Sequence, residues 1–359
     1  METFGEAMAE QILDLEPATD QELELPPALL TRHASLIEAG LRRSGLPGRS
    51  QLGRMTSYHL GWVTPDGHPA TANGGKRIRP SLCIWASEAL GGDPHQAVPA
   101  AVAVELIHNF TLIHDDIQDG DEHRRHRPTV WSIWGMPQGI NAGDGMHALA
   151  MRTLLAPGPN ADRRMRAAHA LTAAVVEVVE GQCLDISMEG TAAATQATYL
   201  RLATAKTGAL LGASLAAGAI LAGASQQTVR SFDAAGRLLG LAFQIRDDWL
   251  GVWGDPDVTG KGRTGDLERR KLTYPVVAAY EVATGARRLE LQELFCDKQP
   301  GGEFRLRAIL DDLGGPSLTA GVPVVLARDA VAALDACDLP EAALQDFAEV
   351  AIHVAERDR

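Results

Sequence analysis

Apolar residues three and four positions apart recur through nearly the whole chain, whereas alternation with period two is almost absent. The first pattern is typical of helices that bury one face, and the second is what half-buried strands require. Gly and Pro interrupt the helical pattern at intervals, but no interruption is long or polar enough to indicate a linker between domains. A length of 359 residues would by itself favour about two domains. The pattern instead predicts an all-α protein with one large helical domain over residues 26–359.

The charge distribution argues against nucleic-acid binding and distinguishes the N-terminal residues from the rest of the chain. The formal net charge is −13, from 33 Lys and Arg against 46 Asp and Glu. Nucleic-acid binding needs the opposite, a basic footprint, so we expect no nucleic-acid partner. Residues 1–31 contain eight acidic residues and no Lys or Arg, which also differs from the basic start of a secretory signal. We interpret residues 1–25 as an acidic N-terminal segment, either a mobile tail or a loose helix.

Two further features concern where the protein works. The cysteines lie far apart without metal-ligand spacing, which is typical of buried thiols in a reducing compartment, so we expect a cytoplasmic protein. Residues 208–224 contain no charge, but they are mostly Ala and Gly. These 17 residues fall short of the roughly 20 strongly apolar residues that a membrane span requires. We therefore expect no membrane span but an interior helix, in which Gly208 and Gly212 let a neighbouring helix approach closely.

A first acidic cluster follows a long apolar segment. Residues 104–119, VELIHNFTLIHDDIQD, end in Asp115, Asp116 and Asp119. On a helix, Asp115 and Asp119 lie about 40° apart and one turn along the axis, with Asp116 beside them. Carboxylates at the end of a largely buried helix repel one another and lose hydration, so a cation should compensate them. Oxygen ligands at this spacing suit Mg²⁺ shared with a substrate phosphate. A solvated acidic turn is the alternative interpretation of the same residues.

A second apolar segment, FQIRDDWLG at 243–251, contains Asp247 and Asp248 but has Gly251 where a third acid would fall. Alone, this pair is weak evidence for a metal site. The chain offers a comparison in Asp311 and Asp312, which are followed closely by a Gly pair and which we interpret as an ordinary helix end.

Basic residues recur around both acidic clusters. The segment GGKRIRP at 74–80 places Lys76 and Arg79 beside a Gly pair and before a helix, where backbone N–H groups and cations can surround an anion. The other polar residues placed in this way are Arg124, Arg125, Lys206, Thr207, Lys261 and Lys271. Any one of the cations is most simply interpreted as a surface charge. Their repeated placement around acids indicates one or two Mg²⁺-bridged diphosphates.

Six motifs in order give the chain a family resemblance: GGKRIRP, ELIHNFTLIHDDIQD with RR and RPT after it, GQCLD, KTG, FQIRDD and GKGRTGDLERRKLTYP. Together they resemble the trans-isoprenyl diphosphate synthases, the polyprenyl synthases that extend allylic diphosphates with isopentenyl diphosphate. The resemblance implies a single helical bundle of the isoprenoid synthase type around a central cavity, a homodimer, and two aspartate-rich motifs that face each other. Three residues depart from the family pattern: Gly251 in place of the last Asp of the second motif, His126 in place of a Gly, and the bulky Trp249.

The resemblance also implies roles for individual residues. It assigns Mg²⁺, three ions with substrate bound, to Asp115, Asp116 and Asp119 in the first motif and to Asp247 and Asp248 in the second. It assigns the isopentenyl diphosphate to Lys76, Arg79, His108 and Arg125. It assigns the allylic diphosphate to Arg124, Lys206, Thr207, Gln244, Lys261 and Lys271. Without the resemblance, His108 would be interpreted as a core histidine, and its place seven residues before Asp115 favours the substrate role.

The resemblance implies a reaction in which cations neutralise the leaving diphosphate while the allylic C–O bond breaks. The double bond of isopentenyl diphosphate then attacks the allylic cation. In the family, residues just before the first motif limit the length of the product, and here Phe110 and Thr111 lie five and four residues before Asp115. Five helical residues advance about 7.5 Å, so the ring of Phe110 is expected well below the metals. One aromatic at this place resembles geranylgeranyl diphosphate synthases, and farnesyl diphosphate is the shorter alternative.

Two other functions fit part of the pattern. A class I terpene cyclase on the same scaffold would ionise an allylic diphosphate but would have no use for Lys76, Arg79, His108 and Arg125. A non-catalytic partner subunit of another prenyl synthase would typically have lost an acidic cluster or its cations, and here only position 251 departs. Similarity of fold alone would not separate these functions from a synthase.

Overall fold

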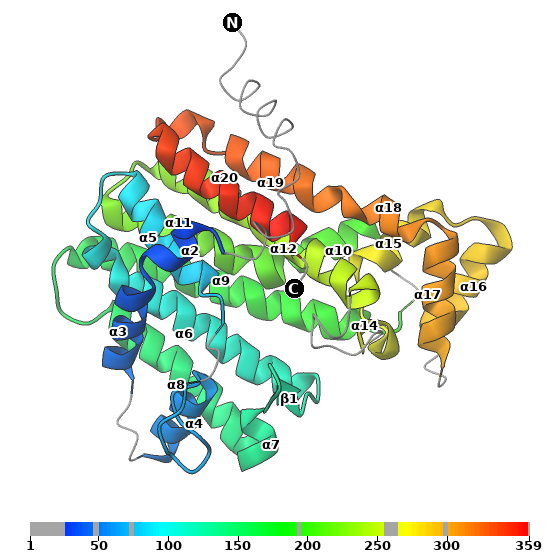
Figure 1. Cartoon of the computed structure of the whole chain (residues 1–359), viewed down its shortest axis with the longest axis horizontal. Helices are drawn as coiled ribbons and strands as arrows, with labels where there is room; N and C mark the ends of the chain where they lie inside the picture. The colour runs from blue at the N-terminus through cyan, green and yellow to red at the C-terminus, as the bar shows by residue number, and fades with distance from the viewer. Residues whose placement is uncertain are drawn as a thin grey trace, which may run out of the picture. The chain divides into compact units, whose positions relative to one another are not determined.

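The structure, a computed structural model, describes residues 26–45, 50–71, 75–191, 195–254, 265–296 and 301–357. Within these ranges the chain is almost entirely helical (Figure 1). The only strands there are β1 (His123–Arg124) and β2 (Arg127–Pro128), which pair antiparallel with Arg124 opposite Arg127. The all-α fold that the periodicity predicts is confirmed.

The chain divides into two compact units. Unit 1 comprises the described residues within 1–27, 174–212 and 233–359, and unit 2 comprises those within 28–173 and 213–232. The divisions fall inside three helices, which are α9 (Ala161–Met188), α11 (Ala209–Ala222) and α12 (Gln226–Trp253). A single domain over residues 26–359 stays a prediction, and each unit is described by itself.

Unit 2 is built around α6 (Pro94–Gln118). Asp93 caps this helix by accepting a hydrogen bond from the backbone N–H of His95, and Pro94 takes the first helical position, where a missing N–H costs nothing. The other elements of the unit are α2 (Ala28–Arg32), α3 (Ala34–Ser44), α4 (Gln51–His59), α5 (Ile78–Ala89), β1, β2, α7 (Val130–Trp134) and α8 (Met136–Leu154).

The surroundings of α6 explain its apolar sequence. The helix packs against α3, α5 and α8, and α8 runs beside it in Figure 1. Buried alanines such as Ala100, Ala101 and Ala103 let these neighbours approach closely. Because the helix is covered along most of its length, the acids in its last turn are its main polar feature.

Unit 1 contains the rest of α9 and α12 and the elements that follow them. These are α10 (Gln196–Ala203), the π-helical turn η2 (Thr204–Gly208), α14 (Gly265–Arg269), α15 (Tyr274–Val282), α16 (Gly285–Cys296), α17 (Gly302–Asp312), α18 (Gly315–Ala320), α19 (Val322–Ala332), η3 (Asp335–Cys337) and α20 (Glu341–Glu356). One hydrophobic cluster, with Tyr199, Ile245, Val276, Phe295 and Leu306 among its members, joins α10, α12, α14, α15, α16 and α17. Helix α17 ends at Asp312, which confirms that Asp311 and Asp312 mark a helix end.

Within unit 1, glycines let the backbone at the start of α11 lie in direct contact with the backbone of α12. A Cβ added at Gly236 would lie 2.5 Å from the carbonyl oxygen of Leu211 and 2.7 Å from the Cα of Gly212. A Cβ added at Gly240 would lie 2.6 Å from the Cα of Gly208. The close approach expected at Gly208 and Gly212 is confirmed, and it requires glycine on both helices.

Three helical stretches are long and apolar enough to cross a membrane by length and composition alone: Pro94–Gln118, Gln196–Ala222 and Gly315–Cys337. The protein itself buries 72% of the most apolar window in the first stretch, 83% in the second and 33% in the third. The second stretch contains most of the charge-free segment, and its burial is that of an interior helix. The absence of a membrane span stays a prediction.

The glycine crossing is testable through protein stability. Gly236→Ala is expected to lower the free energy of unfolding by about 1–3 kcal/mol, because the added methyl group overlaps backbone atoms that cannot move independently. Gly321→Ala is a matched control, since nothing lies within 4 Å of a Cβ added there and its φ of −79° suits any residue. Denaturant unfolding measures both variants. Equal stability of Gly236→Ala and the wild type would contradict the close crossing.

Candidate active site

The candidate residues fall into two groups, one in each unit. The group in unit 2 begins with the acids that end α6. The side chain of Asp116 is 1% exposed and its Oδ1 accepts a hydrogen bond from Arg124 Nε at 2.6 Å, whereas Asp115 and Asp119 are partly exposed. Burial raises the pKa of Asp116 to about 6, although the neighbouring Arg124 acts to lower it. Asp116 is thus held by the protein, and Asp115 and Asp119 stand one turn apart for other ligands.

A tight hairpin brings arginines back to these acids. Between β1 and β2, Arg125 and His126 have φ angles of 51° and 60°, the left-handed region that a two-residue hairpin turn demands at both positions. Glycine adopts that region readily and other residues do so at a cost. This explains why a family pattern has Gly where this chain has His126. The turn directs Arg125 toward Gly75, where an added Cβ would lie 2.7 Å from the guanidinium.

Arginines then surround a partly buried histidine. Arg79 Nη1 lies 3.5 Å from His108 Nε2, and burial, followed by the charges of Arg79, Arg125 and Arg124, holds the pKa of His108 well below its usual range. Burial and the adjacent Arg124 also lower the pKa of Arg125. Of the residues predicted to bind isopentenyl diphosphate, the structure brings Arg79, His108 and Arg125 together, and Lys76 directly follows Gly75. This arginine cluster (Arg79, Arg124 and Arg125 around His108) has the electrostatics of an anion site.

Several residues at the arginine cluster carry no signal in the sequence. His59, at the end of α4, lines a small pocket with Asp116, Arg124 and Arg125, and burial, reinforced by nearby arginines, lowers its pKa to about 3. Its neighbour Tyr58 fastens the hairpin by donating a hydrogen bond to the carbonyl of Pro128 at 2.7 Å. Only the folded chain brings these residues to the site, because α4 lies about fifty residues before the first acidic cluster in the sequence.

Two further residues set the geometry behind the cluster. Arg77 pairs with the buried Glu105, whose Oε1 also accepts a hydrogen bond from Asn109 at 2.9 Å. Arg77 has a φ of 51° and immediately precedes α5, so the pair fixes the turn that carries Lys76 and Arg79.

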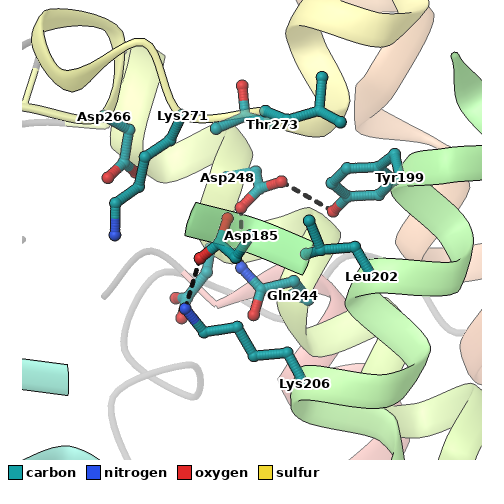
Figure 2. Close-up of a pocket in the computed structure, with 11 residues that line it drawn as sticks. Asp185, Tyr199, Leu202, Lys206, Gln244, Asp248, Asp266, Lys271 and Thr273 are labelled. Atoms are coloured by element: carbon teal, nitrogen blue, oxygen red, sulfur yellow. Dashed lines mark hydrogen bonds and ion pairs between the residues drawn. The ribbon is translucent and has the colours of Figure 1, made fainter. Parts of the chain in front are cut away.

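The group in unit 1 begins at the π-helical turn η2, which contains Lys206 and Thr207. Such widened turns are frequent at functional sites. Lys206 Nζ forms an ion pair with Asp185 at 2.6 Å, and this gives the GQCLD segment a local role (Figure 2). A Cβ added at Gly181 would lie 2.6 Å from the backbone nitrogen of Lys206, so the glycine of that segment admits the turn.

The next residues form a chain of hydrogen bonds that ends on Asp248. Thr207 donates to Gln244 at 2.6 Å, and Gln244 donates to Oδ1 of Asp248 at 2.8 Å. The other oxygen of Asp248 accepts from Tyr199 at 2.7 Å and from the backbone of Tyr274 at 2.8 Å. Burial raises the pKa of Asp248 to about 7, although these hydrogen bonds act to lower it. Asp248 therefore orients Gln244 and Thr207, while its role as a metal ligand stays a prediction.

Asp247 has a different environment. Its side chain is 36% exposed and accepts a hydrogen bond from Arg357 at 2.5 Å. It lines a pocket of about 130 Å³ together with Lys206, Asp248, Asp266 and Lys271. Figure 2 shows Asp266 and Lys271 side by side at this pocket. The pocket thus combines carboxylates with lysines, as a metal-bridged diphosphate requires.

Gly251, a departure from the family pattern in the second motif, lies beside Asp266. A Cβ added at Gly251 would lie 2.7 Å from Oδ2 of Asp266, so the carboxylate of Asp266 occupies the space beside the glycine. No pattern in the sequence marks Asp266 as a residue of this pocket. Lys261 lies outside the described residues. Among the described residues, no three His, Cys, Asp or Glu side chains lie close enough to form a ready-made metal cluster.

Comparison with known proteins agrees with this chemistry. Residues 66–313 match the family described as polyprenyl synthetase. The chain is 40% identical over 353 residues to a (2E,6E)-farnesyl diphosphate synthase of Mycobacterium tuberculosis, covering 92% of this chain and 97% of that protein. It is 44% identical over 256 residues to a geranylgeranyl diphosphate synthase of the same species, covering 71% and 73% of the two chains.

Solved structures agree as well. A polyprenyl synthetase from Streptomyces coelicolor A3(2) matches with a TM-score of 0.84 at 40% identity, covering 92% of this chain and 99% of that one. A polyprenyl synthase from Caulobacter crescentus, solved with calcium and isoprenyl diphosphate, matches with a TM-score of 0.77 at 28% identity, covering 92% and 97%. The chain belongs to the polyprenyl synthetase family and is a trans-prenyl diphosphate synthase.

Proposed function

We propose that the protein condenses isopentenyl diphosphate with an allylic diphosphate, with the arginine cluster holding the first substrate and the pocket at Lys206 and Asp247 serving the second. The observation that carries the proposal is the presence of two unlike anion sites. One consists of arginines around a neutral histidine, and the other combines lysines with carboxylates. Two diphosphate substrates, of which only one loses its diphosphate, need two sites that differ in this way.

The carboxylates that remain accessible fit Mg²⁺. Asp115 and Asp119 offer oxygens one turn apart, and Oδ2 of Asp116 is buried without a hydrogen-bond partner. We assign the first motif's ions to Asp115 and Asp119, with Asp116 supporting, and a further ion to Asp247, for three in the substrate complex. When bound, Mg²⁺ would offset the negative charge that develops on the leaving diphosphate.

The side chains of the chain perform the other parts of the reaction. Lys206, which pairs with Asp185, binds the allylic diphosphate, and Asp248 orients Thr207 and Gln244 for the same substrate. The role of Arg124 toward this diphosphate is the one that the family resemblance implies. Arg79 and Arg125 hold the charge of isopentenyl diphosphate, and the neutral imidazole of His108 has one N–H to donate. The allylic C–O bond breaks with its electron pair leaving on the diphosphate, the isopentenyl double bond forms the new C–C bond, and the departed diphosphate takes the released proton. No side-chain base is required.

The arginine cluster also separates this function from its rivals. A terpene cyclase ionises one diphosphate and gains nothing from a second anion site. A non-catalytic subunit has no need for arginines held around a partly buried neutral histidine, which costs stability. Both acidic clusters and the arginine cluster together favour a synthase.

The product is proposed to be geranylgeranyl diphosphate, formed above Phe110. That side chain is 9% exposed and packs against His114 and, from α8, His147, with ring centres 5.2 and 5.3 Å away. Thr111 donates its hydroxyl to the carbonyl of His108 at 2.8 Å and leaves only a small side chain beside the ring. Similarity to a farnesyl diphosphate synthase over nearly the whole chain supports the shorter product as the second candidate.

A homodimer is proposed from one face of α9. Val176, Val179, Cys183 and Ile186 recur at helical spacing and are all exposed. An apolar stripe of this kind on a helix is typical of a face that another surface covers. A second copy of the chain is the occupant that the family resemblance implies. A cytoplasmic location is proposed separately, from cysteines that lie far apart in the sequence without metal-ligand spacing.

The activity is tested with Mg²⁺ and labelled isopentenyl diphosphate, offered with dimethylallyl, geranyl or farnesyl diphosphate. We expect label in longer diphosphates and accumulation at twenty carbons. Asp115→Asn is expected to lower kcat/KM by about 100-fold or more, because a metal ligand is lost. Asp312→Asn, an exposed acid at the end of α17, is the matched control without effect. A hydrocarbon product without label would establish the cyclase, and silence with every starter would favour the subunit.

Product length is tested with Phe110→Ala. We expect a product longer by at least one five-carbon unit, because the ring no longer blocks the growing chain. Phe232→Ala removes a more deeply buried ring, 0% exposed, that packs against Trp85, and is expected to lose stability but keep the product. An unchanged product from folded Phe110→Ala would remove Phe110 as the floor.

The dimer is tested with Val176→Lys. Val176 is 55% exposed on α9, and Val325, 54% exposed on α19, supplies a control at equal exposure. Light scattering after gel filtration should show monomer for Val176→Lys and dimer for Val325→Lys and the wild type. A dimeric Val176→Lys protein would place the interface elsewhere.

A further inference from the structure

Arg357, the residue after α20, lies against α12 at the second acidic motif. Its side chain is only 6% exposed. The guanidinium donates from Nη2 to Asp247 at 2.5 Å and to the carbonyl of Phe243 at 3.3 Å, and its central carbon lies 3.6 Å from the centre of the Phe243 ring. The proposed reaction gives this arginine no role.

A second arginine, Arg246 of α12, also binds the end of α20. Arg246 of α12 donates from Nε to the carbonyl of Arg357 at 2.7 Å and from Nη2 to the carbonyl of Glu356 at 3.2 Å. A cation on the last carbonyls of a helix also complements the helix dipole. The same guanidinium lies 4.6 Å from the centre of the Trp249 ring, which gives that bulky residue a structural role.

The spacing on α12 makes this attachment specific. Phe243, Arg246 and Asp247 are three and four residues apart and so share one face of the helix. A guanidinium as buried as that of Arg357 needs a negative partner, because an unpaired buried charge is costly. Asp247 is the carboxylate that supplies it, whereas Asp248 accepts its hydrogen bonds from Tyr199, Gln244 and Tyr274.

We propose that Arg357 is the resident counter-cation of Asp247, a positioning residue that lowers the affinity of the second acidic motif for divalent cations. The inference rests on the proposed function, in which Asp247 is a metal ligand. A positive charge on the same carboxylate reduces the attraction for a second cation and fixes one oxygen away from it. A divalent cation that binds together with a diphosphate carries less net positive charge, so the guanidinium of Arg357 repels it less. Arg357 thereby favours loading of the motif together with substrate.

Free Mn²⁺, followed by electron paramagnetic resonance during titration, is the probe. Arg357→Gln is expected to tighten Mn²⁺ binding about three- to tenfold, the effect of removing one neighbouring charge from a partly exposed carboxylate. Arg357→Lys keeps the charge and should stay close to the wild type. Arg287→Gln is the matched control, since it removes a cation that is paired with Glu290 and Asp312 elsewhere in unit 1.

A double-mutant cycle shows whether the effect passes through Asp247. In the Asp247→Asn background, Arg357→Gln should no longer tighten Mn²⁺ binding. Unchanged or weaker Mn²⁺ binding by Arg357→Gln, or tightening that persists in the Asp247→Asn background, would overturn the inference. If Asp247→Asn alone leaves Mn²⁺ binding unchanged, the metal role of Asp247 in the proposed function fails instead.

Should Arg357→Gln not fold, Arg246→Gln releases the same helix end from the other side. It is expected to tighten Mn²⁺ binding in the same direction while leaving Arg357 in the chain. Unaltered Mn²⁺ binding by this variant would also count against the inference.

Discussion

Carboxylates on largely buried stretches of helix have lost much of their hydration, and the arrangement of both proposed sites follows from how each carboxylate is compensated. In unit 2, Asp116 turns inward and takes Arg124 as its partner. In unit 1, Asp248 turns inward and is held by three hydrogen bonds from uncharged donors. These inward acids are structural anchors, and in each case they leave a more exposed neighbour, Asp115 or Asp247, for chemistry. Adjacent acids in one motif thus divide into a buried one that other side chains hold and a more exposed one that we propose as a metal ligand, and in the second motif the exposed acid also pairs with Arg357.

The arginine cluster is also constrained by the cost of bringing like charges together. Arginines gathered around His108 repel one another, and the imidazole lowers this cost by remaining neutral. The hairpin that brings Arg125 to this cluster holds two residues in the left-handed region of φ. This backbone strain lowers stability locally, and the turn places the guanidinium beside His108. Arg77, paired with Glu105, holds the turn that precedes α5 and carries Arg79. An anion that enters this cluster relieves repulsion that the folded protein already carries, which favours its binding.

Features written in local patterns could be predicted from the sequence, and features made by distant segments could not. The helix ending at the first acids, the helix end at Asp312 and the close approach at Gly208 and Gly212 all follow from periodicity and small residues, and the structure confirms them. His59 and Arg357 could not be predicted, because α4 and the end of α20 reach their sites only through tertiary packing. Asp266 could not be predicted for a different reason: in the sequence Gly251 stands where an acid would fall, and only the structure shows that the carboxylate of Asp266 lies beside it.

The π-helical turn at Thr204–Gly208 has a consequence for how the chain can vary. A π turn contains one residue more than an α turn, so it shifts the angular phase of everything that follows by about 100°. Deleting that residue would restore a regular helix but rotate Gly208 and Gly212 off the face that meets Gly236 and Gly240. Inserting another would displace Lys206 from Asp185. The π-helical turn therefore sets the rotation of α11 relative to Lys206. Its length is constrained on one side by the Lys206–Asp185 ion pair and on the other by the glycine crossing with α12.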